Sequence, residues 1–505
     1  MNLKKIFKDK YFRIFIFFLI LYSTFIIRAH NYEKVPPANH LDEMLYSWSG
    51  LYLIETGIPV SWSTLDYPKK AEVFSGEVTY KGGIPNVWVT LYRPWLDEPP
   101  LFSLIVGWFA HINHAVRTDV IPSSYIRIPV IFFAALTSIM IFLIAKKISG
   151  YWTGILSMIL FGTIPLFVFA SRSAMPENLI ALILTVIFYL LLNFLEKDKS
   201  WLIYPIPILI GIAGLSKPTG YLLLPFVLFI VFTHYYQSKA VKSAIYSSLY
   251  LILATIPFLF AYFAYGYLMD AAIFKNILAI QSNRPIGFGS LAWYFITPAY
   301  KTDLLKDSWF VFCLLSSAYF IFTTKFFKNL RDLSDRSSLV IFVFVYTVIM
   351  VMISGGENDL LAWYRFPSYP FLAIIGAWGL QYLVKKADFF SSFIVAGMLL
   401  GNRMLLANDF RDNIHPGLYR NILSALLLPS ILRGVFNLNI LDRISKGLII
   451  GVIIVGIYFN IIYIYNAFEI ACESKTCPIV PSTVLSTLHF PFFWRFMVLG
   501  KPDRY

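Results

Sequence analysis

Apolar segments long enough to cross a lipid bilayer recur along almost the whole chain, and they constrain its fold more than any other feature. About 20 apolar residues cross the hydrocarbon layer as a helix, and a helix satisfies its own backbone polar groups there. Of the 505 residues, 58% are hydrophobic and only 14% are charged, which is unlike a soluble domain. The sequence therefore predicts an all-α polytopic membrane protein.

The basic residues lie between the apolar segments rather than in one patch. They precede the first segment and follow alternate later ones, as at Lys146–Lys147, Lys239 and Lys385–Lys386. Lysine and arginine are enriched in this way in cytoplasmic loops. We therefore interpret the net charge of +14 as a signal of topology, and we expect no nucleic-acid partner.

Under this charge rule, the segments predict about thirteen transmembrane helices, a cytoplasmic N-terminus and an extracytoplasmic C-terminal tail. The first segment, 11–28, lacks a small-residue cleavage site and is expected to be retained. The later spans are expected at 122–145, 151–170, 178–195, 201–215, 219–234, 243–268, 308–324, 338–353, 363–384, 389–407, 418–436 and 447–467. The apolar stretch 99–114 is short and is followed by charges, so it is predicted to be an interfacial helix.

An extracytoplasmic loop is expected over residues 29–121. Within it, residues 42–56 have apolar side chains at helical spacing and end before a Gly-Ile-Pro sequence, which predicts a helix. Residues 71–80 and 86–92 are rich in valine, threonine and aromatics around two glycines. This composition predicts a β-hairpin.

Cysteine and histidine residues give weak signals. Cys472 and Cys477 lie in the predicted tail. They could form a short disulfide loop or remain two free thiols, and the sequence leaves both alternatives open. Two thiols without a nearby histidine do not predict a zinc site. His111 and His114 lie three residues apart, and His40 lies close to Asp42. A divalent cation is one interpretation, but interfacial histidines are more often amphipathic surface, so we assign no metal ligand and no certain cofactor.

Acidic and basic side chains gather at the predicted outer ends of the helices. They are Asp42, Glu43, Asp97, Glu98, Arg172, Glu177, Lys217 and the pair Tyr364–Arg365. Each has a structural alternative: the acids could stabilise helix N-termini, and the cations could be snorkelling residues at helix ends. Acids and cations on one face also suit transfer of a group to a hydroxyl. The chain has no phosphate-binding glycine loop for a nucleotide, so we expect a lipid-linked donor.

The order of short motifs resembles the GT-C glycosyltransferases, in the branch that contains protein O-mannosyltransferases and the lipid A aminoarabinose transferase. The motifs, which extend to about residue 385, are Asp42-Glu43, Asp97-Glu98-Pro99-Pro100-Leu101, Arg127, Ser171–Glu177, Gly214–Gly220 and Tyr364–Pro370. The resemblance implies that Asp42 is the general base, with Glu43 beside it. Glu177 stands where the family usually has a second acidic residue, normally aspartate.

This chain departs from the family pattern immediately before the proline pair, where Glu98 replaces the usual histidine or lysine. The lipid phosphate would then need another cation, because Glu98 repels it. The candidates are Arg93, Lys217, Arg284 and Arg365. Asp97, Arg172 and Tyr364 complete the expected substrate-binding set.

The expected protein moves a sugar from a polyprenyl-phosphate donor to a hydroxyl of a lipid, glycan or protein acceptor at the outer membrane face, with inversion. The expected organisation is a catalytic transmembrane module over 1–385, further transmembrane helices over 386–468, and a tail over 469–505. A transporter or flippase for a lipid-linked or amphipathic substrate is the alternative, with the same charges lining a path. Its sites would be expected near the midplane, whereas these charges lie on one side.

Overall fold

A computed structural model describes residues 9–36, 41–78, 87–117, 119–283, 307–333, 335–354, 362–399, 416–436 and 438–466. Arg284, His40, Cys472, Cys477, the expected hairpin turn and the expected tail lie outside these residues. The N-terminal part contains α2 (Lys10–Ala29), α3 (Leu41–Thr56), β1 (Ser61–Trp62), η1 (Lys69–Ala71), β2 (Glu72–Val78), β3 (Val87–Tyr92) and α4 (Pro100–Ile112). The helical bundle that follows begins at α5 (Ser123–Ile126) and α6 (Ile128–Ser149).

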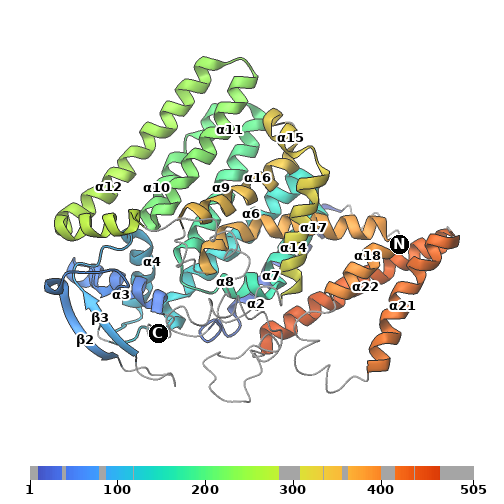
Figure 1. Cartoon of the computed structure of the whole chain (residues 1–505), viewed down its shortest axis with the longest axis horizontal. Coiled ribbons are helices and arrows are strands. Elements are labelled where there is room, and N and C mark those ends of the chain that lie inside the picture. Colours follow the sequence, from blue (N-terminus) through green and yellow to red (C-terminus); the bar gives the residue numbers. More distant parts are fainter. Residues whose placement is uncertain are drawn as a thin grey trace.

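The bundle continues through further helices (Figure 1). Its next members are α7 (Tyr151–Thr163), α8 (Pro165–Ala170), α9 (Pro176–Lys197), η2 (Ser200–Ile203), α10 (Ile206–Ser216), η3 (Pro218–Leu222), α11 (Leu223–Gln237) and α12 (Val241–Ser282). The later members are α14 (Ser308–Thr323), α15 (Phe326–Asp332), α16 (Arg336–Ser354), η5 (Ala362–Ser368), α17 (Tyr369–Lys386), α18 (Phe389–Ile394), η6 (Val395–Leu399), α21 (Pro416–Phe436) and α22 (Asn439–Asn466).

Within the described residues, seven helices are long and apolar enough to cross a membrane. Shorter apolar helices, such as α7 and α14, lie among them. The all-α polytopic fold is therefore confirmed, and the chain is a multi-pass membrane protein. The count of thirteen spans and the division of the chain at residue 385 stay predictions.

The helix α12 differs from the expected span 243–268, because it extends to Ser282. Pro257 lies inside it, and the backbone leaves helical geometry only at Asp270. The Oδ1 atom of Asp270 accepts hydrogen bonds from the backbone of Ala272 and Ile273, both at 2.9 Å. The side chain thus starts a second helical segment, which crosses above α4 in Figure 1. A capping interaction of this kind explains a kink.

The small sheet in the outer loop has the strand order β1-β3-β2. The predicted hairpin is confirmed, since β2 and β3 pair antiparallel with Phe74 opposite Leu91 and Val78 opposite Val87. The two-residue strand β1 was not predicted; it pairs with the other edge of β3. Figure 1 shows β2 and β3 beside α3 and α4, at one end of the bundle.

The helices α3 and α4 touch backbone to backbone at two glycines. A Cβ atom on Gly50 would lie 1.8 Å from the Ser103 carbonyl oxygen, and one on Gly107 would lie 2.3 Å from the Gly50 carbonyl carbon. Atoms cannot approach so closely, so α3 keeps its position only if both residues remain glycine. This contact fixes the start of α3, where Asp42 and Glu43 lie.

Gly50→Val is expected to destabilise the protein by about 3 kcal/mol, because an overpacked contact between backbones cannot relax by moving a side chain. Thermal unfolding in detergent measures the change. Gly451→Val, in α22, is the matched control, since no atom lies within 4 Å of a Cβ there. Equal loss of melting temperature in both variants would contradict the close contact.

Two opposite ends of the bundle carry different polar groups. At one end, the Lys147 ammonium binds Glu196, and His234 lies 3.0 Å from Asp198. These residues lie in or next to the loops that the charge rule assigns to the cytoplasm. The acids expected to form the site lie at the other end, as described next.

Candidate active site

The first turn of α3 carries two adjacent acids with different surroundings. Glu43 is fully buried. Its carboxylate accepts hydrogen bonds from Nε and Nη2 of Arg127 at 2.9 and 2.6 Å, and from the backbone N–H of Ala174 at 2.7 Å. Asp42 is only partly buried and lies inside the helix rather than at its N-cap. The catalytic role expected for Glu43 stays a prediction, but its contacts are those of a residue that positions α3.

Three buried arginines surround this turn. Arg127 also donates to the carbonyl oxygens of Tyr32 and Pro36, both at 2.8 Å. Arg172 donates to the carbonyl oxygens of Arg28, Val35 and Ile27 at 3.0, 3.1 and 2.7 Å. The bonds to Ile27 and Arg28 satisfy carbonyls at the end of α2, which have no partner within the helix. The bonds to Tyr32, Val35 and Pro36 hold the segment that follows it. The guanidinium of Arg172 holds this segment through its own bonds, and its expected role in substrate binding stays a prediction.

Arg28 was not singled out from the sequence. It is 1% exposed and donates to Ser171 Oγ at 2.9 Å and to the Phe161 carbonyl at 2.6 Å. A cation at the end of an apolar span suggests snorkelling to the interface. In the structure it packs inward, and so it fixes the loop that leads to Glu177.

Asp97 belongs to a hydrogen-bond network within the outer loop. Its carboxylate accepts from Ser63 Oγ at 2.5 Å and from the Tyr67 hydroxyl at 2.8 Å. The same hydroxyl accepts the Leu96 N–H at 2.8 Å. Burial, followed by the charge of Asp97, raises the pKa of Tyr67 above its ordinary value. The N-cap of α4 is Pro99, which makes no side-chain capping bond, and stabilisation of this helix start by Asp97 or Glu98 stays an open alternative.

Glu177 and Lys217 form a buried ion pair across the site. The Lys217 Nζ atom lies 2.5 Å from Glu177 Oε1, and these residues are 4% and 2% exposed. The same ammonium lies over the Tyr364 ring, 4.2 Å from its centroid. The sequence predicted all three residues for the site, and the structure brings them together from α9, the α10–η3 connection and η5.

Tyr46 is a buried residue of α3 on which several acidic residues act electrostatically. Burial is the largest cause that raises its pKa well above the ordinary value, and Glu98, Glu177 and Asp42 add to the rise. Glu98 also acts electrostatically on Lys217. Asp42, Glu98 and Glu177 therefore all act electrostatically on this one buried tyrosine. Tyr46 was missed from the sequence, although it stands four residues after Asp42 and so shares its helix face.

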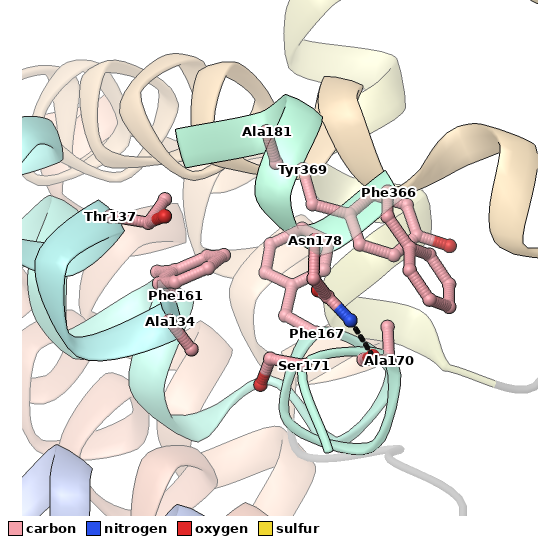
Figure 2. Close-up of a pocket in the computed structure, with 10 residues that line it drawn as sticks. All are labelled: Ala134, Thr137, Phe161, Phe167, Ala170, Ser171, Asn178, Ala181, Phe366 and Tyr369. Atoms are coloured by element: carbon pink, nitrogen blue, oxygen red, sulfur yellow. Dashed lines mark hydrogen bonds between the residues drawn. The ribbon is translucent and has the colours of Figure 1, made fainter. Parts of the chain in front are cut away.

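The other expected cations occupy different surroundings. Arg93 is exposed, next to the sheet. Arg365 is fully buried in η5, one residue after Tyr364. The neighbouring pocket is drawn in Figure 2, which shows it lined by Asn178 and by aromatic and small side chains. No acid or base lines this pocket, so it does not carry the chemistry of the site.

The described residues contain no group of three histidine, cysteine or carboxylate side chains that could hold a metal. His111 lies 3.2 Å from Glu55, which also binds Arg117 at 2.8 Å. This histidine therefore belongs to an exposed ion-pair cluster on α3 and α4. Cys313 is a buried free cysteine inside α14.

Residues 97–261 match the family named dolichyl-phosphate-mannose-protein mannosyltransferase. The matched segment is less than half of the chain and contains Asp97, Glu98, Glu177 and Lys217. No curated protein matches the sequence.

Several solved structures have a similar fold. ArnT from Cupriavidus metallidurans bound to undecaprenyl phosphate is 14% identical, with 90% of this chain and 76% of ArnT covered and a TM-score of 0.48. Archaeal oligosaccharyltransferase AglB from Archaeoglobus fulgidus, in complex with an inhibitory peptide and a dolichol-phosphate, is 12% identical, with 98% of this chain and 58% of AglB covered and a TM-score of 0.50. Arabinosyltransferase EmbB from Mycobacterium smegmatis is 11% identical, with 88% and 40% covered and a TM-score of 0.50.

The structural similarity to AglB and EmbB shows a shared fold. The sequence match shows a similarity to the mannosyltransferase family over residues 97–261. Both agree with the resemblance found in the motifs. The chain is a multi-pass membrane protein with the GT-C fold, and over residues 97–261 it resembles the protein mannosyltransferases.

Proposed function

We propose that this protein transfers a sugar from a polyprenyl-phosphate carrier to an acceptor hydroxyl at the extracytoplasmic face of the membrane. The observation that supports this most directly is the buried Glu177–Lys217 ion pair against the Tyr364 ring, with Asp42 and Glu98 near enough to act electrostatically on Tyr46. Acids and a cation in one partly buried site suit proton removal next to an anionic leaving group.

In the proposed reaction, Asp42 takes the proton from the acceptor hydroxyl. The hydroxyl oxygen bonds to the anomeric carbon, and the bond between that carbon and the phosphate oxygen breaks. The phosphate leaves with the electron pair, opposite the attacking oxygen, so the anomeric configuration inverts. Asp42 suits the base because it is partly buried and stands at the site, whereas Glu43 is bound by Arg127.

The leaving phosphate would be held by the remaining N–H donors of Lys217. One of its three donors reaches Glu177, which leaves two for the phosphate oxygens. Support for a lipid-linked donor comes from the matched family, whose name contains dolichyl-phosphate mannose, and from AglB, which was solved with a dolichol-phosphate. No divalent cation is assigned to this site.

The proposal is tested with purified protein in proteoliposomes that contain polyprenyl-phosphate mannose, glucose or arabinose carrying a radiolabel. Transfer of one labelled sugar to an added lipid or peptide hydroxyl supports the proposed function. Movement of the carrier across the bilayer without any transfer would support the transporter instead.

The outer location of the site gives a separate prediction. In a variant without the native cysteines, a cysteine at Ser75 should react with an impermeant thiol reagent added outside whole cells, and one at Asp335 should not. Both positions lie in the described residues, in β2 and immediately before α16. The reverse labelling pattern would place the site in the cytoplasm.

A further inference from the structure

We propose that Glu177 recognises a hydroxyl of the donor sugar and so determines sugar specificity; this inference rests on the proposed function. Glu177 uses only one of its oxygens inside the protein. Oε1 accepts from Lys217 Nζ at 2.5 Å, whereas Oε2 is buried and has no hydrogen-bond donor within the described part of the chain. The residue as a whole is 2% exposed.

A buried carboxylate oxygen without a donor is costly, and native structures satisfy such atoms with protein, water or a ligand. Here the carboxylate has a fixed orientation, because Lys217 holds Oε1 and is itself held over the Tyr364 ring. The carboxylate oxygen Oε2 is therefore preorganised to accept a hydrogen bond. The Tyr46 ring lies in the same electrostatic cluster. An acceptor oxygen beside aromatic rings suits the hydroxyls and carbon face of a sugar.

The ion pair also argues against Glu177 as the general base. A proton placed on Glu177 would leave the Lys217 ammonium buried without its counter-charge, which is unfavourable. Asp42 is only partly buried in the first turn of α3, and we assign the acceptor proton to it. The two carboxylates thus have different roles: Asp42 takes the proton of the acceptor hydroxyl, and Glu177 binds a hydroxyl of the donor sugar.

The test combines a variant with altered donors. The wild-type protein is first assayed with polyprenyl-phosphate mannose, glucose and arabinose, and the donor it uses is then compared with its monodeoxy analogues. One deoxy donor should reduce kcat/KM of the wild-type protein by about 10- to 100-fold, since a bond to a charged group is lost. Glu177→Gln should lose a similar factor with the parent donor, and it should show almost no further loss with that same deoxy donor.

Glu177→Gln leaves Lys217 without a charged partner and could fold poorly, so Glu177→Asp, which keeps the negative charge on a shorter side chain, is assayed as well. Its ratio of kcat/KM between parent and deoxy donor should also be closer to one than the wild-type ratio, because the shorter carboxylate no longer places an oxygen at the position of Oε2. Glu55→Gln removes an exposed acid of α3 that binds Arg117, and it is the control that should keep the wild-type ratio.

The pH profile provides the readout that a purely structural role would not affect. If Glu177 binds a hydroxyl, the dependence of kcat on pH should be the same in Glu177→Gln and in the wild-type protein. If Glu177→Gln lost the acidic limb of the kcat–pH profile, the inference would be overturned and the proposed function would stand. The same holds if Glu177→Gln lost as much kcat/KM with every deoxy donor as the wild-type protein does. A wild-type protein that transfers no sugar from any donor would overturn the proposed function, and the inference with it.

Discussion

Asp42→Asn should reduce transfer by about a hundredfold or more, while the melting temperature of the protein stays almost unchanged. The substitution keeps the size of the side chain and removes the proton acceptor, and the loss of a general base costs about 10²- to 10⁴-fold. Asp42 is only partly buried in the first turn of α3. Its contribution to stability should be the modest one of an acid near a helix N-terminus.

Initial rates of sugar transfer in proteoliposomes measure this effect, with the amount of inserted protein matched between samples. Asp66→Asn is the control, because Asp66 is an exposed acid of the same outer loop. Transfer by Asp42→Asn at the wild-type rate would remove Asp42 from the catalytic role. A large drop in melting temperature would instead assign it a structural one.

Much of the fold could be predicted because hydropathy determines where a chain can cross lipid. Apolar length, charge between segments and helical spacing located α2, α3, α9 and the β2–β3 hairpin. The kink in α12 could not be found in this way. It depends on the Asp270 side chain bonding to the next turn, whereas Pro257 lies inside the same helix without a departure from helical backbone geometry.

The gathering of the acids could also be predicted, because alternate loops of a bundle meet at the same end. The partners of these acids in ion pairs could not be predicted. Glu43 binds Arg127, 84 residues away, and nothing in the local sequence separates Glu43 from its neighbour Asp42. Likewise, Lys217 was expected as a free cation for the phosphate, and the structure pairs it with Glu177.

The second large effect is expected on stability. Glu43→Gln should destabilise the protein by about 3–5 kcal/mol, because it leaves the Arg127 guanidinium buried without a counter-charge. Both side chains are fully buried, and the carboxylate binds two nitrogens of the guanidinium as well as the Ala174 N–H. The pair joins α3, the head of α6 and the loop before α9. Its loss should therefore lower the melting temperature of the detergent-solubilised protein and its yield in the membrane.

The two adjacent acids should therefore give different results: Asp42→Asn should lose transfer activity, and Glu43→Gln should lose stability. A double-mutant cycle with Arg127→Met measures the coupling, and the double variant should lose less stability than the sum of the two single variants. Part of the loss should remain, because Arg127 also binds the Tyr32 and Pro36 carbonyls. Additive losses would contradict the ion pair. If Glu43→Gln kept its melting temperature and lost transfer, Glu43 would join Asp42 in the chemistry, as the motif resemblance implies.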